Sequence, residues 1–224
     1  MKISAILMSR VLAFVDTVDL RPTSGLPLQE FIEEIVKQYD FKKFPQTIEE
    51  FNPQKGIEFV GGRLNKTAIT KLVIWPNLLV IEGRCATNEC QKMLSEILEW
   101  ATPKFDLTYK PEMITRYAYV SDLSIESTAP LLTYDPLLAR IAEKVGKSLT
   151  EIWNDQIKYE AIEFKIGHDP LDRKWGIAPF QITRRAEHKF TENKYFSEAP
   201  LPTHQHIALL EEYEKGIIER TRVN

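Results

Sequence analysis

Cysteine is scarce in this chain, and the scarcity excludes two classes of protein. Only Cys85 and Cys90 occur among 224 residues, too few for the disulfide framework of a small secreted domain. Four residues separate them, which is not the C-x-x-C spacing of a zinc knuckle or a redox pair. We therefore expect both to be reduced core thiols in a cytoplasmic protein.

Long apolar runs and a strong net charge are also missing. The opening run MKISAILMSRVLAFVD is split by Arg10 and closed by Asp16, so it predicts a first strand rather than a signal peptide. No other run approaches the roughly 18 apolar residues that span a bilayer, so we expect no membrane partner. The net charge of -3 provides no global basic field for nucleic acid, and any contact with phosphate must be local.

The common enzyme motifs are absent as well. The chain contains no G-x-x-x-x-G-K-S/T, no G-x-G-x-x-G after a strand, no H-E-x-x-H and no G-x-S-x-G. Gly61 and Gly62 fall inside a predicted strand, where they indicate a bulge or a close backbone approach rather than a phosphate-binding loop. These absences remove the usual nucleotide-binding and hydrolase assignments, but not folds whose active residues are scattered.

The patterning that is present predicts an α+β fold. Hydrophobic residues make up 43% and charged residues 27% of the chain, as in an ordinary globular domain. Strand patterns and helical periodicities do not alternate strictly, so we expect a mixed or mainly antiparallel sheet with about four packed helices. We predict a single domain over 1–224, with a possible subdomain boundary near 102–112. Strands are expected at 3–20, 57–64, 69–75, 78–84, 117–125, 159–166 and 180–184.

The third of these helices starts from a clear signal. Asp135 and Pro136 match the N-cap and first helical position. Gly146 and the capping-box pattern Ser148-x-x-Glu151 predict a break and a second helical segment. Apolar residues recur at helical spacing and predict a buried stripe: Leu138, Ile141, Ala142, Val145 and Leu149.

One element could carry phosphodiester chemistry. Glu163 and Lys165 are two apart on a predicted strand and so project from one face, where a carboxylate can bind Mg²⁺ and an ammonium can stabilise phosphorane charge. This E-x-K element resembles that of the PD-(D/E)xK nuclease superfamily. The resemblance implies a second acidic ligand, Asp155 or Glu143, although no strand-borne Pro-Asp precedes them. Alternating charge on a solvated strand face is the other interpretation.

Histidines and nucleophiles give no clear site. His168, His188, His204 and His206 all lie in the last third of the chain, but their spacing matches no metal-ligand pattern, so we expect surface histidines and no metal. Ser197 has no neighbouring base in the sequence. Cys90 falls on the apolar side of a predicted helix, where packing explains it.

A basic and aromatic segment, RKWGIAPFQITRRAEHKFTENKY (173–195), is the main candidate binding surface. Its arginines and lysines outnumber its acidic residues by a local +4. Guanidinium groups bind phosphate or carboxylate, and aromatic rings stack on bases or anchor protein interfaces. The alternative is a strand and a loop that covers the sheet edge, with both arginines paired to acidic helix faces. The candidate partner or phosphate-binding residues are Arg173, Lys174, Trp175, Arg184, Arg185 and Lys189.

These patterns favour a non-catalytic interaction or assembly subunit that docks through 173–195. We expect a protein partner or self-association as a homo-oligomer, and no cofactor. Two alternatives remain open. One is a metal-dependent nuclease-like phosphodiesterase that uses Glu163, Lys165 and Asp155 with Mg²⁺, and the other is a non-catalytic nucleic-acid binder whose affinity falls with salt.

Overall fold

A computed structural model describes residues 1–22, 25–47, 49–133, 135–169, 171–172 and 176–223. It contains four α-helices and eight β-strands paired in an antiparallel sheet, which confirms the α+β class. Arg173, Lys174 and Trp175 of the basic segment lie outside the described residues. Short 3-10 helices occur at Pro53–Lys55, Pro111–Met113 and Phe190–Glu192.

The chain divides into two compact units. Unit 1 comprises Met1–Ala5, Asp122–Pro200 and His204–Asn224, and unit 2 comprises Ile6–Ser121 and Leu201–Thr203. Strands β1 (Lys2–Phe14) and β5 (Arg116–Glu126) contribute residues to both. The chain passes between the units at 5–6, 121–122, 200–201 and 203–204. The expected single domain and its possible subdomain boundary near 102–112 stay predictions.

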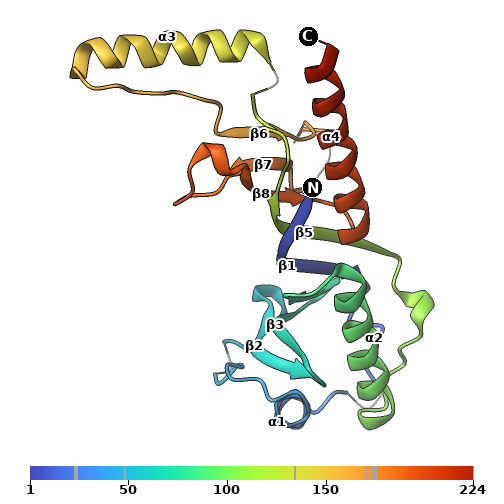
Figure 1. Cartoon of the computed structure of the whole chain (residues 1–224). Helices are drawn as coiled ribbons and strands as arrows, with labels where there is room; N and C mark the ends of the chain where they lie inside the picture. Colours follow the sequence, from blue (N-terminus) through green and yellow to red (C-terminus); the bar gives the residue numbers. More distant parts are fainter. Residues whose placement is uncertain (23–24, 48, 134, 170, 173–175, 224) are drawn as a thin grey trace. The chain divides into compact units, whose positions relative to one another are not determined.

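Unit 2 is a sheet with two helices, and its strands run in the order β2-β3-β4-β1 (Figure 1). The sheet contains β2 (Ile57–Leu64), β3 (Thr67–Trp75) and β4 (Leu78–Gly83), and the turn between the last two is Pro76-Asn77, as predicted. Helix α1 (Leu28–Tyr39) contacts β2, and α2 (Thr87–Lys104) contacts β4.

Each helix of unit 2 buries one face, on which apolar residues recur at helical spacing. On α1, Phe31, Ile32, Ile35 and Tyr39 are buried, and on α2 the buried positions include Cys90, Leu94, Ile97, Leu98 and Ala101. They join β1, β2, β3 and β4 side chains in one hydrophobic cluster. Because each helix presents its whole apolar face to that cluster, burial in unit 2 agrees with its sequence pattern.

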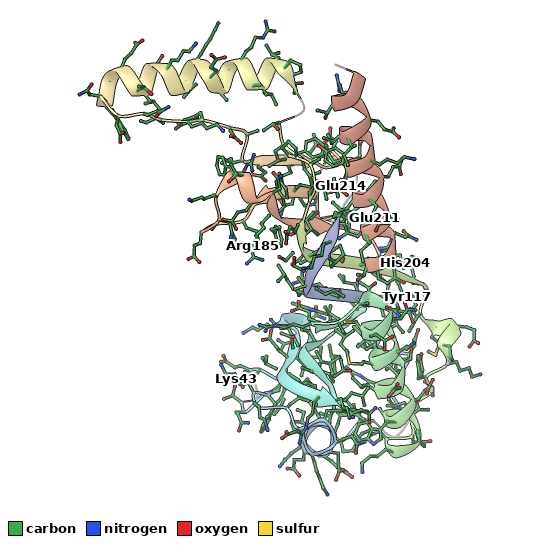
Figure 2. All side chains as sticks on the ribbon, viewed as in Figure 1. Lys43, Tyr117, Arg185, His204, Glu211 and Glu214 are labelled. Carbon is green, nitrogen blue, oxygen red and sulfur yellow. The ribbon has the colours of Figure 1, made fainter. Side chains whose placement is uncertain are left out.

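Unit 1 has a sheet in the order β5-β8-β7-β6, with β6 (Glu163–Ile166), β7 (Phe180–Arg184) and β8 (Lys194–Ala199). Helix α4 (Thr203–Val223) lies against this sheet. Tyr213 of α4 stacks on Phe164 of β6 with ring centroids 5.8 Å apart. Glu214 accepts hydrogen bonds from Ser127 Oγ at 2.7 Å and Thr128 N at 2.8 Å, so a buried carboxylate ties α4 to the segment after β5 (Figure 2).

Candidate docking surface

Helix α3 (Pro136–Trp153) of unit 1 has strong signals at both ends. The Asp135 carboxylate accepts hydrogen bonds from the amides of Leu137 at 2.7 Å and Leu138 at 3.0 Å, as an N-cap residue does. Asn154 ends the helix in the left-handed conformation, with φ of 53°. These local interactions fix where α3 begins and ends.

The helix does not break at Gly146, and the predicted second segment at Ser148 is wrong, because α3 is continuous to Trp153. Gly146 serves packing instead. A Cβ at this position would lie 2.8 Å from the carbonyl oxygen of Ile157, so only glycine lets the backbone of residues 154–162 approach the helix. We call residues 154–162 the return segment, since they run back along α3 to β6 (Figure 1).

A side chain closes this contact. Thr150 Oγ1 donates to the carbonyl of Gly146 at 2.8 Å and accepts from the amide of Ile157 at 3.1 Å. The return segment therefore covers the side of α3 that carries Gly146 and Thr150. On a helix with 100° between residues this side lies next to the apolar face, not on it.

The apolar face of α3 is open, and the prediction that it is buried is wrong. Gly146 is the one buried residue of the helix. Leu138 is 51% exposed, Ile141 is 49% exposed and Ile152 is 72% exposed, although the periodicity is that of a core-facing helix. We call this surface the α3 stripe; it consists of Leu138, Ile141, Ala142, Val145, Leu149 and Ile152.

Exposed apolar side chains continue beyond the helix. Trp153 is 68% exposed at the C-terminal end of α3, and Tyr159 and Ile162 are exposed on the return segment. Ile166 is exposed on β6, which is the last strand of its sheet and pairs with β7. Monomeric proteins rarely leave a contiguous apolar surface of this kind open unless it docks onto another surface.

Arg184 of the basic segment is buried and its guanidinium is occupied within unit 1. Its Nε donates to the carbonyl of Ala161 at 3.1 Å, and Nη1 donates to the carbonyl of Phe190 at 2.9 Å. Its Nη2 lies 2.7 Å from the Glu160 carboxylate. Arg184 thus holds the end of the return segment against the loop between β7 and β8, a positioning role that the sequence did not indicate.

The other basic side chains of this region are partly compensated. Arg185 Nη1 donates to Ser124 Oγ at 2.9 Å (Figure 2). The Glu192 carboxylate accepts hydrogen bonds from Lys194 Nζ, the Lys189 amide and the His188 ring. These bonds lower the pKa of Glu192 to about 2. Of Arg185, Lys189 and Lys194, only Lys189 has an exposed side chain. The local +4 already includes Glu192, and Glu160, which lies outside the segment, neutralises one further charge by pairing with Arg184.

The E-x-K element is only partly assembled. Lys165 Nζ and Glu163 Oε1 lie 3.9 Å apart on one exposed side of β6, as their spacing predicts. Asp155 is exposed in the return segment, and Glu143 pairs with Lys147 on α3 at 2.7 Å, which lowers the Glu143 pKa. Among the described residues no three acidic, histidine or cysteine side chains are grouped to hold a metal ion.

A buried serine and histidine pair was missed. Ser197 Oγ lies 2.9 Å from His206 Nε2 and donates to the carbonyl of Gln181 at 2.8 Å, so the interpretations of Ser197 without a base and of His206 at the surface are both wrong. Both residues are fully buried, so no substrate reaches the hydroxyl and the pair is structural. The signal was available, because His206 continues the helical stripe of Leu210 and Ile217.

The described helices include none whose length and apolar character would let it cross a membrane. Neither the models of known protein families nor the curated proteins contain a match to this chain.

Proposed function

We propose that this protein is a non-catalytic assembly subunit that self-associates through the α3 stripe. The observation that carries the proposal is a capped, amphipathic helix whose apolar face leaves Leu138, Ile141, Val145 and Ile152 exposed, with Ala142 and Leu149 half-buried. A helix with this pattern gains little from folding alone, because its stability comes mainly from covering the apolar face. A partner surface supplies that cover.

A second copy of the same stripe is complementary to the first. If two α3 helices pack antiparallel with Val145 at the centre, Leu138 of one copy faces Ile152 of the other. The Val145 side chains of the two copies then meet at the middle. Contacts of this kind repeat on both sides of a two-fold axis, which is the commonest symmetry of protein dimers.

A stable dimer interface also requires more surface area than α3 alone supplies. An 18-residue helix is about 27 Å long, and a stable interface buries about 800 Å² on each partner. One face of a helix of this length supplies only part of that area. Tyr159, Ile162 and Ile166 would supply the remainder, since they extend the exposed apolar surface onto the return segment and β6.

Sedimentation velocity on the wild-type chain and two matched variants tests the proposal. Val145→Glu places a charge in the stripe, and Lys147→Gln makes the same change of charge on the far face of the helix. We expect dimers for wild type and Lys147→Gln at micromolar concentration, and monomers for Val145→Glu. A monomeric wild type, or a dimeric Val145→Glu, would contradict self-association through this face.

A further inference from the structure

Unit 2 contains a deep apolar cleft that is separate from α3. It has a volume of about 510 Å³, within the range of about 300–1,000 Å³ that small-molecule sites occupy. Residues of helices α1 and α2 and of strands β2, β3 and β4 contribute to its lining. Its deep end is formed by buried side chains, among them Ile35, Leu72, Leu94 and Ile97.

The lining restricts the chemistry of a ligand. Among the described residues that line the cleft, only Thr17 and Arg21 have polar side chains. The Thr17 hydroxyl donates to the carbonyl of Pro76 at 2.8 Å and is therefore occupied. The lining provides no acid, base or nucleophile, so the cleft is suited to binding and not to catalysis.

Arg21 is the one charged residue in this lining, and its side chain is exposed. Within the described part of the chain, no carboxylate lies at ion-pair distance from it. The half-buried Leu26, Phe51 and Leu107 line the cleft nearer to solvent. A ligand with a long apolar body and an anionic end group would match this lining, because guanidinium forms strong charge-assisted bonds with carboxylate.

We propose that this cleft binds a medium-chain fatty acid, with the acyl chain between α1 and α2 and the carboxylate on Arg21. Protein interiors are normally close-packed, so an apolar space of this volume is stabilised when a ligand of matching character fills it. The carboxylate distinguishes a free fatty acid from its neutral esters. This inference rests on unit 2 alone and is independent of the dimer proposed above.

Calorimetric titration with laurate, below its micelle concentration, tests the site, with methyl laurate as the neutral probe. We expect Arg21→Gln to weaken laurate binding about tenfold and to leave methyl laurate unchanged. Lys66→Gln removes an exposed charge from the turn between β2 and β3 that does not line the cleft, and this variant should bind as wild type does.

Ala101→Phe fills the cleft from α2 and should abolish binding of both probes, with a thermal unfolding curve to show that the variant folds. Absence of laurate binding to the wild type would overturn the proposal, and so would wild-type affinity in folded Ala101→Phe. Equal loss of laurate and methyl laurate in Arg21→Gln would overturn the assignment of the carboxylate.

Discussion

At the scale of single residues, the most informative side chains are those whose chemistry suggested binding but whose contacts are internal. Arg184 was expected to meet a partner, yet its three donor groups are satisfied within unit 1. Only the contacts reveal this, because a sequence gives the charge of an arginine and not the position of the carbonyls around it. His206 was expected at the surface, and its side chain is buried in the core.

Arg184→Met should therefore destabilise the protein rather than weaken binding. Removing the Arg184 guanidinium leaves two carbonyls without donors and leaves Glu160 with Lys158 as its remaining ion-pair partner, which costs about 3 kcal/mol. Arg185→Met is the matched control, since it loses a single hydrogen bond to Ser124 and should cost about 1 kcal/mol or less. Urea unfolding measures both. Equal urea midpoints for the two variants would show that the contacts of Arg184 add no more stability than the single hydrogen bond of Arg185.

At the scale of elements, periodicity located the four helices and seven of the eight strands, but it missed β8 and made the strands at 3–20 and 159–166 too long. It also predicted burial unevenly. The faces of α1 and α2 are buried as expected, because a neighbouring sheet covers them. The same periodicity in α3 predicted burial, and the structure leaves the face open. A hydrophobic repeat shows which side of a helix avoids water, but not whether the same chain supplies the cover.

Glycine substitutions in two helices of unit 1 should have opposite signs. Gly216→Ala in α4 meets no atom within 4 Å and should stabilise the protein by about 1 kcal/mol, through helix propensity. Gly146→Ala should destabilise it, since its Cβ would lie 2.8 Å from the Ile157 carbonyl oxygen. Urea unfolding compares the two. A stabilised Gly146→Ala would show that the return segment is not packed on α3.

At the scale of the whole molecule, charge and composition set limits but did not identify a surface. A net charge of -3 gave no reason to favour nucleic acid, and the basic segment proved to be partly neutralised by Glu160 and Glu192. The E-x-K pair forms as expected on β6, without a third ligand among the described residues. Charge and composition suggest no role for the exposed apolar face of α3. Packing against a second copy of the chain would give this face a role.

Cross-linking of Val145→Cys with a short bismaleimide tests the central claim most directly. Antiparallel packing about position 145 brings the two introduced thiols together across the two-fold axis, whereas Lys147→Cys places them on the far faces of the helices. The account predicts a covalent dimer for Val145→Cys at micromolar concentration, with wild type and Lys147→Cys remaining monomeric on a denaturing gel. Equal cross-linking of the two cysteine variants, or none in either, would contradict assembly through the α3 stripe.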